Sequence, residues 1–190
     1  MGINIPNILT WGRIALIPVF IGVFYLPDAW VSMMQKNVLA TIFFTTAAIT
    51  DWLDGYLART LKQASAFGAF LDPVADKLMV ASSLIMLVQL GRVDILVSII
   101  IIGREITISA LREWMALEGQ ATSVAVARIG KIKTGVQMTA IPMLLFEAPL
   151  FYMSMRVVGT ILIYIAAALT LWSMGYYLHR ALAAKKSGTT

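Results

Sequence analysis

The chain has 190 residues, of which 59% are hydrophobic and 13% are charged, and its mean hydropathy is +0.83. This composition excludes an ordinary soluble domain and favours a helical membrane protein forming a single domain over residues 1–190. Fifteen Lys and Arg outnumber ten Asp and Glu, a bias that we assign to membrane topology rather than to nucleic acid binding. The absence of Cys and the presence of one His exclude thiolate and His-pair metal sites. Carboxylates, Arg and Lys are therefore the side chains that remain as candidates for a functional site.

Six apolar stretches can each cross a bilayer, which takes about 20 residues. In chain order they cover residues 8–26, 38–56, 74–90, 95–115, 134–146 with its flanks, and 157–178. Turn and breaker residues separate them, among them Pro27-Asp28, the stretch 65–68, Gly91-Arg92 and Ala148-Pro149. The sequence therefore predicts an all-α integral membrane protein with six transmembrane helices.

The distribution of Lys and Arg predicts the orientation of these helices. When the helix ends are assigned alternately to the two sides, one side carries only Lys36, Arg92 and Arg156. The other side carries Arg13, Arg59, Lys62, Lys77, Arg112, Arg128, Lys131, Lys133, Arg180, Lys185 and Lys186. Because positive charge accumulates on the cytoplasmic side, both termini are expected in the cytoplasm.

Four aspartates stand close together in the sequence around the second and third predicted helices. At about 100° per residue, Asp51, Asp54, Gly55 and Ala58 share a sector of roughly 100° at the cytoplasmic end of helix two. Asp72 and Asp76 are four residues apart, so they project together if helix three includes them. Four carboxylates can therefore converge at one membrane depth.

Unpaired acids at the centre of a membrane helix cost about 2.5 to 3.5 kcal/mol each, less near the interface, so a cation should accompany them. Oxygen-only ligands favour magnesium, manganese or calcium over zinc or copper, and two ions suit displacement at phosphorus. Gly55 and Ala58 would let a phosphate-bearing ligand approach the backbone, and Arg59 could pair with a phosphate.

Each of these residues also has an ordinary structural interpretation. Asp72 before Pro73 is typical of a helix N-cap with proline at the first helical position. Asp54 and Arg59 could form an interfacial ion pair, while Gly55 and Ala58 could serve helix packing. These interpretations explain poorly why two acids occur on each of two neighbouring helices.

The segment from Asp51 to Asp76 matches the pattern DxxDGxxARx8Gx3Dx3D and thereby resembles the CDP-alcohol phosphotransferase family. The resemblance implies a six-helix, homodimeric membrane enzyme that displaces CMP from a CDP-linked lipid, using divalent metal. It implies that Asp51, Asp54 and Asp72 are metal ligands and that Asp76 completes the metal site and acts as general base. It further implies that the nucleotide and pyrophosphate lie along Asp54, Gly55, Ala58, Arg59 and Gly68.

A second group of charged residues bears on the acceptor alcohol: Arg104, Arg128, Lys131 and Lys133. Arg104 lies roughly 15 Å into helix four, and an intramembrane Arg is a functional candidate, although a structural pair with Glu105 or another acid is an equal alternative. Lys131 and Lys133 are about 200° apart on a helix, so at least one could merely reach toward the interface. Cations beside a metal site suit an acceptor that bears phosphate.

The segments Gly103-Arg104-Glu105 and Gly130-Lys131-Ile132-Lys133-Thr134 are similar to one branch of the family, whose acceptor is sn-glycerol 3-phosphate. We therefore expect phosphatidyl transfer from CDP-diacylglycerol to sn-glycerol 3-phosphate, with two Mg²⁺ or Mn²⁺ ions, at the cytoplasmic face of a bacterial inner membrane. Inositol phosphate, serine or a phosphatidyl lipid are the alternative acceptors. A cation-coupled transporter is the alternative class, but it predicts inverted repeats, and we find none.

Overall fold

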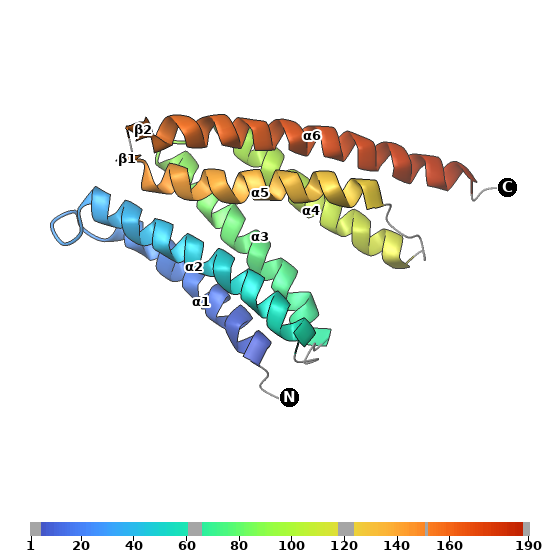
Figure 1. Cartoon of the computed structure of the whole chain (residues 1–190), viewed down its shortest axis with the longest axis horizontal. Coiled ribbons are helices and arrows are strands. Elements are labelled where there is room, and N and C mark those ends of the chain that lie inside the picture. The colour runs from blue at the N-terminus through green and yellow to red at the C-terminus, as the bar shows by residue number, and fades with distance from the viewer. Residues whose placement is uncertain (1–4, 61–65, 118–123, 151, 188–190) are drawn as a thin grey trace.

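The computed structural model describes residues 5–60, 66–117, 124–150 and 152–187. Within these ranges the chain forms six helices and one short β-hairpin (Figure 1). The elements are α1 (Ile5–Tyr25), α2 (Met33–Thr60), α3 (Ala66–Gln89), α4 (Ile95–Leu117), α5 (Val124–Phe146), β1 (Pro149–Leu150), β2 (Met153–Ser154) and α6 (Met155–Ser187). The predicted all-α class is confirmed, apart from the hairpin.

Every predicted apolar stretch lies in its own helix, but three helices begin well before the predicted span. α2 begins at Met33, α3 at Ala66 and α5 at Val124. The predicted break at residues 65–68 is wrong in part, because Gly68 is already helical. Polar residues interrupt the starts of α2 and α5, at residues 35–37 and 128–133, but they can still be helical outside the apolar layer. The start of α3 is apolar over residues 66–71 and was missed because a break was expected at 65–68.

Two of the described helices are apolar and long enough to cross a membrane: α1 over the 18 residues Ile8–Tyr25 and α6 over the 21 residues Met155–Gly175. Large apolar side chains also cover the outside of the bundle. Ile85, Ile99 and Trp172 are 59%, 59% and 74% exposed. Side chains of this kind on the outer face of a helix bundle are suited to contact lipid.

The helices pack around one apolar core. α1 packs against α2 and α3, α2 packs against α5, and α5 and α6 form the most extensive pair. Phe20, Phe44, Leu84 and Ile141 are fully or almost fully buried in this core. α5 and α6 approach closely at Gly159, where an added Cβ would lie 2.8 Å from Leu144 Cγ.

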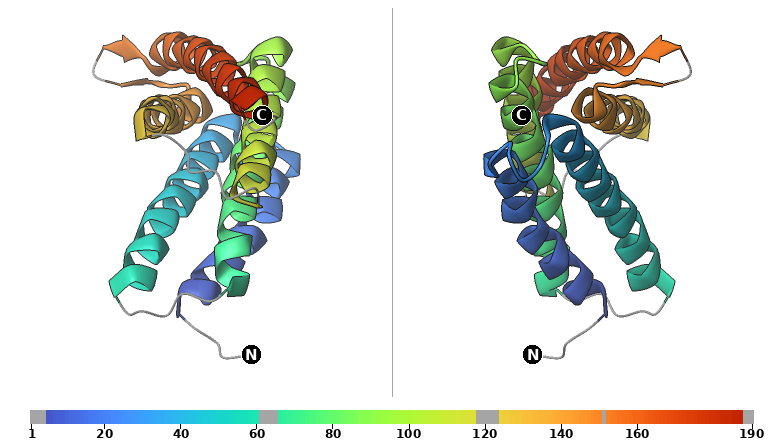
Figure 2. Two further views of the ribbon diagram at one scale, coloured as in Figure 1. Left: turned by 90° about the vertical axis from the view of Figure 1, so that its right-hand side faces the viewer. Right: turned by 90° about the vertical axis from the view of Figure 1, so that its left-hand side faces the viewer.

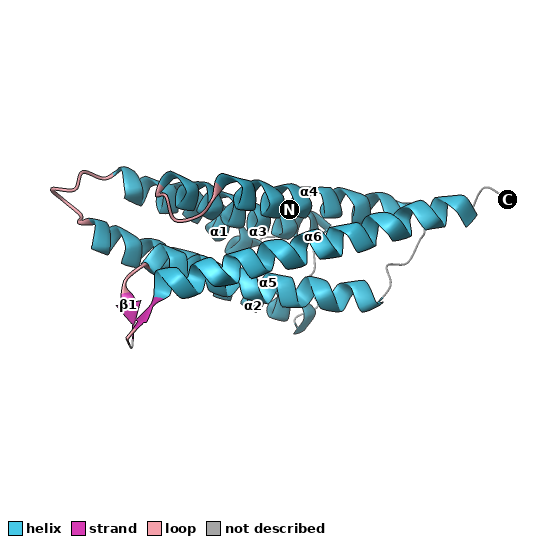
Figure 3. Ribbon diagram, turned by 90° about the horizontal axis from the view of Figure 1, so that it is seen from above, coloured by secondary structure: helices cyan, strands magenta, loops and turns pink. Residues whose placement is uncertain are grey.

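The helices α2 and α5 approach each other near the hairpin and diverge toward their other ends (Figure 1). We call the two ends of the bundle the hairpin end and the aspartate end. The hairpin end contains the connections 26–32, 90–94 and 147–154; the strands project there from the helices (Figures 2 and 3). The aspartate end contains the end of α2, the start of α3, the end of α4 and the start of α5.

Arg92 connects several elements at the hairpin end. This buried side chain donates from Nη1 to the carbonyl oxygens of Leu144 (3.1 Å) and Leu145 (2.8 Å), at the end of α5, and from Nη2 to Asn37 Oδ1 (2.9 Å). It also forms an ion pair with Glu147, 2.7 Å from Nη2 to Oε2. Burial lowers the pKa of the Arg92 guanidinium, and the Glu147 carboxylate opposes that shift. One side chain thus joins α2, the α3–α4 connection and α5.

Glu147 occupies a position after α5 where a glycine would be expected. Its φ is 62°, in the left-handed region, which is unfavourable for a side chain with a Cβ. The side chain pairs with both Arg92 and the more exposed Arg156, whose Nη1 lies 3.0 Å from Oε1. These two ion pairs explain why a glutamate stands here in spite of the backbone strain.

Candidate active site

Three of the motif's four aspartates have described side chains, and they lie on two neighbouring helices at the aspartate end. Asp51 lies on α2, and Asp72 and Asp76 lie on α3; all three are partly exposed. α3 includes both Asp72 and Asp76, which is the condition under which the two side chains project together. The alternative that Asp72 is an N-cap is wrong, because α3 begins at Ala66, and Pro73 therefore lies inside the helix.

Two residues of α1 contact these aspartates. Arg13 Nη1 lies 2.5 Å from Asp51 Oδ1, and the Thr10 hydroxyl donates a hydrogen bond to Asp72 Oδ1. Both α1 side chains are buried, at 3% and 1% exposure. The N-terminal helix thus supplies a cation to one carboxylate and a hydroxyl to the next. The sequence carries no local signal for either contact, since 62 residues separate Thr10 from Asp72.

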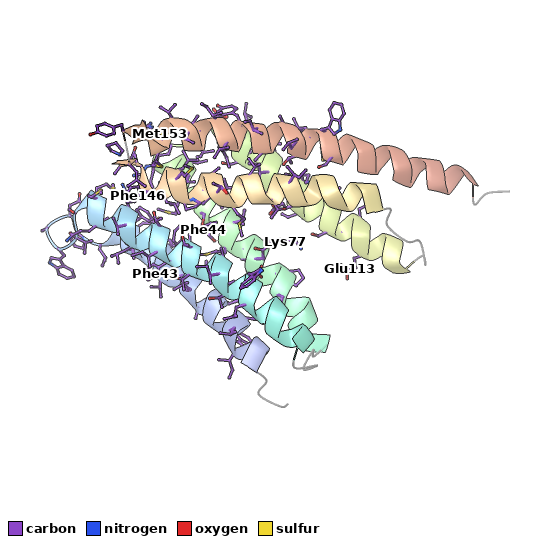
Figure 4. The ribbon with its side chains drawn as sticks, viewed as in Figure 1. Phe43, Phe44, Lys77, Glu113, Phe146 and Met153 are labelled. Atoms are coloured by element: carbon purple, nitrogen blue, oxygen red, sulfur yellow. The ribbon has the colours of Figure 1, made fainter. Side chains whose placement is uncertain are left out.

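Asp76 faces the interior, one helical turn beyond Asp72. It lines a small pocket together with Arg13, Phe44, Ala47, Ala48, Met79, Val80 and Met138. The charges of Asp51, Glu105, Arg13 and Lys77 act on its carboxylate electrostatically. Lys77, labelled in Figure 4, is its neighbour on α3. Asp76 therefore experiences charges from α1, α2 and α4 as well as from its own helix.

Charged residues of α4 and α5 meet within electrostatic range of Asp76. Lys133 is fully buried, and its Nζ lies 2.9 Å from Glu105 Oε1. Gln137 Nε2 donates to the same oxygen at 3.2 Å. Arg104, 7% exposed, donates from Nη2 to Ser173 Oγ of α6 at 3.0 Å. Lys133 thus pairs with Glu105, the partner that the structural alternative assigned to Arg104.

The model of the CDP-alcohol phosphatidyltransferase family matches residues 3–172 of the chain, which includes all of these side chains except Ser173. The chain belongs to this family. The match covers the motif residues from Asp51 to Asp76 and the charged residues of α4 and α5. Membership speaks against the transporter alternative, and it makes the protein a phosphatidyltransferase of the CDP-alcohol class.

Curated relatives in the family match the chain over almost its whole length. A protein of Salmonella paratyphi A is 48% identical over 183 residues, covering 95% of this chain and 96% of the relative. A protein of Pectobacterium atrosepticum has the same identity and coverage, and one of Shigella flexneri serotype 5b is 47% identical over 185 residues, covering 96% and 97%. All three are named CDP-diacylglycerol–glycerol-3-phosphate 3-phosphatidyltransferase.

The aspartates of this CDP-alcohol phosphatidyltransferase suit a hard divalent cation in their donor type, because they supply only oxygen. Among the side chains that the structure describes, no three acids or histidines converge around one point. Asp51 has Arg13 beside it and Asp72 has Thr10, so a cation and a hydroxyl compensate two of the carboxylates. The donor chemistry fits Mg²⁺ or Mn²⁺. The side chain of the fourth predicted ligand, Asp54, lies outside the described residues.

Several predicted site residues have side chains outside the described residues. The backbone places Asp54, Gly55, Ala58 and Arg59 in the last turns of α2, after Asp51, and places Arg128 and Lys131 in the first turns of α5. Gly68 is buried near the start of α3. The backbone therefore places these residues in the helix turns at the aspartate end, whereas Arg104 and Lys133 lie nearer the middle of α4 and α5.

Proposed function

We propose that this CDP-alcohol phosphatidyltransferase transfers the phosphatidyl group of CDP-diacylglycerol to sn-glycerol 3-phosphate, giving phosphatidylglycerol phosphate and CMP. The observation that carries the proposal is the 48% identity, over 95% of the chain, to a relative named for this reaction. The buried cations Arg104 and Lys133, of which Lys133 interacts electrostatically with Asp76, support an acceptor that itself bears phosphate.

The acceptor would bind through its phosphate and react through its primary hydroxyl. Arg104, Arg128, Lys131 and Lys133 would hold the phosphate by charge-assisted hydrogen bonds. Asp76 would take the proton of the primary hydroxyl as general base. The hydroxyl oxygen would attack the phosphorus on the diacylglycerol side in line. The bond from that phosphorus to the bridging oxygen would break, and CMP would leave with the electron pair.

The donor would bind on the side of α2 and the start of α3. Asp54, Gly55, Ala58, Arg59 and Gly68 would lie along the nucleotide and pyrophosphate. Asp51, Asp54, Asp72 and Asp76 would hold two Mg²⁺ or Mn²⁺ ions. Bound ions would neutralise charge that develops on the reacting phosphate oxygens. Arg13 and Thr10 would orient Asp51 and Asp72 for that role.

The membrane arrangement follows from the same proposal. The chain would form one domain over residues 1–190, act as a homodimer and cross a bacterial cytoplasmic membrane six times, with both termini in the cytoplasm. The aspartate end would face the cytoplasm, where a water-soluble acceptor and a lipid donor can meet. The hairpin end carries Lys36, Arg92 and Arg156, the three cations assigned to the outer side.

One experiment tests the reaction and the metal together. Purified protein in detergent is given CDP-diacylglycerol with sn-glycerol 3-phosphate, inositol phosphate, serine or phosphatidylglycerol, and CMP release is measured with and without EDTA. We expect CMP only with sn-glycerol 3-phosphate, loss of activity in EDTA and recovery with Mg²⁺ or Mn²⁺. Release with another acceptor would reassign the substrate, and full activity in EDTA would remove the metal.

A further inference from the structure

Glu105 of α4 joins two residues of α5 that are one helical turn apart. Lys133 Nζ and Gln137 Nε2 both donate to Oε1 of its carboxylate, at 2.9 and 3.2 Å. The Glu105 side chain is 16% exposed, whereas Lys133 and Gln137 are 0% and 1% exposed. The three side chains therefore form a nearly dry polar unit, which we call the Glu105 triad.

Stability alone explains the Glu105 triad poorly. A buried ion pair is often no more stabilising than apolar residues of similar volume, because desolvation offsets the attraction. Gln137 adds a further cost, since its Oε1 is buried without a hydrogen-bond partner among the described residues. Its orientation is fixed, because the amide must turn its N–H group, not its oxygen, toward the carboxylate. Gln137 thus leaves one polar atom unsatisfied while it holds Glu105.

The position of the triad suggests its role. The charges of Arg104 and Asp76, besides that of Glu105, act on Lys133, and Glu105 acts on Asp76. Asp76 is the other carboxylate whose field draws Lys133 toward it. Without Glu105, the ammonium group would be drawn to Asp76, where it would compete for the carboxylate that must accept a proton.

We propose that Glu105 is a positioning residue, which, with Gln137, holds the Lys133 ammonium on the acceptor side of Asp76. The inference rests on the proposed function, because it assigns Lys133 to the acceptor phosphate. Glu105 itself does not contact the substrate. It sets where the lysine charge lies before the acceptor arrives, and it keeps that charge from pairing with the general base.

The test is steady-state kinetics of Glu105→Gln with each substrate varied in turn. We expect the KM for sn-glycerol 3-phosphate to rise by about tenfold, while the KM for CDP-diacylglycerol stays within about twofold. The same change at Glu113, an exposed residue two turns farther along α4 (Figure 4), is the matched control and should alter neither constant. An equal rise in both KM values would overturn the positioning role.

Two further variants separate positioning from a structural role. Gln137→Leu should raise the KM for the acceptor with an unchanged or higher unfolding temperature, because it removes an unsatisfied buried atom. The double variant Glu105→Gln with Lys133→Met removes the pair together, so it should fold as the wild type does but keep the high acceptor KM. Recovery of a normal acceptor KM in the double variant would show that the pair is only structural.

The wild-type protein separates this inference from the proposed function. If the wild type releases no CMP with sn-glycerol 3-phosphate but does so with inositol phosphate, the acceptor assignment fails, and the same variants are measured with that acceptor. If the wild type uses sn-glycerol 3-phosphate and Glu105→Gln leaves its KM unchanged, the reaction stands and the inference about Glu105 fails.

Discussion

The guanidinium of Arg13 on α1 contacts the carboxylate of Asp51 on α2 at 2.5 Å, and the two side chains differ in burial, at 1% and 39% exposure. The arginine is therefore the member of the pair that has lost its hydration. Asp51 supplies a counter-charge to this buried group, whereas Asp51 itself still reaches solvent. In the same place a divalent cation would compete with Arg13 for the aspartate.

This competition gives a prediction about stability. Arg13→Gln should lower the free energy of unfolding in EDTA by about 1 to 3 kcal/mol, because it removes a charge-assisted hydrogen bond. Mn²⁺ should restore more stability to this variant than to the wild type, since the cation then supplies the missing charge. Thermal unfolding in detergent measures both effects. Arg13→Lys is the control, and equal stabilisation of all three proteins by Mn²⁺ would contradict the competition.

Asp76 is predicted to act in catalysis rather than in donor binding. Asp76→Asn should lower kcat by about 10²- to 10⁴-fold, because an amide cannot accept the hydroxyl proton. Binding of CDP-diacylglycerol, followed by a fluorescent analogue, should persist. Asp94→Asn at the exposed hairpin end carries the same chemical change and should keep full activity. Near-normal CMP release by Asp76→Asn would remove the general-base assignment.

Arg104 is predicted to bind the acceptor phosphate. Arg104→Ala should raise the KM for sn-glycerol 3-phosphate by about 10- to 100-fold, since a charge-assisted hydrogen bond contributes about 1.5 to 3 kcal/mol. The KM for CDP-diacylglycerol should change far less. Ser173→Ala removes the residue on α6 that accepts from Arg104 and should have a smaller effect. A similar rise in both KM values for Arg104→Ala would point to a structural role.

The hairpin end offers a comparison of two arginines that share one carboxylate. Arg92→Ala should destabilise the fold by about 3 to 5 kcal/mol, because it leaves two buried carbonyl groups of α5 without their donor and Glu147 with Arg156 alone. Arg156→Ala should cost at most about 1 kcal/mol, since Arg156 is 53% exposed. Unfolding midpoints in detergent test this order. Equal effects would show that burial does not decide the strength of these pairs.

The sequence predicted the number of described helices and the shared helix face of Asp72 and Asp76, because both depend on local patterns. Apolar stretches of membrane length identify helices without any knowledge of their partners, and the i, i+4 spacing puts Asp72 and Asp76 on one face once the helix is known. The start of α3 was missed for a physical reason. Pro73 is typical of a first helical turn, yet here it lies inside the helix, after Asp72.

Contacts between helices could not be predicted in this way. For Arg104 the sequence left a functional role and a structural pair with Glu105 or another acid equally open, and it gave no indication of a partner for Glu105 on another helix. Glu105 pairs with Lys133, 28 residues away on α5. The contact from Thr10 to Asp72 likewise depends on how α1 crosses α3. Such partners are determined by which helices pack against each other. The periodicity of residues within one helix carries no information about that arrangement.

The projecting hairpin also allows the orientation of the protein in the membrane to be measured. The sequence has no cysteine, so Met153→Cys would introduce the only thiol, at a position that is 56% exposed on β2 (Figure 4). In intact cells a membrane-impermeant maleimide should label this thiol without permeabilisation, if the hairpin lies outside. A thiol placed at Gly2 should react only after the membrane is opened.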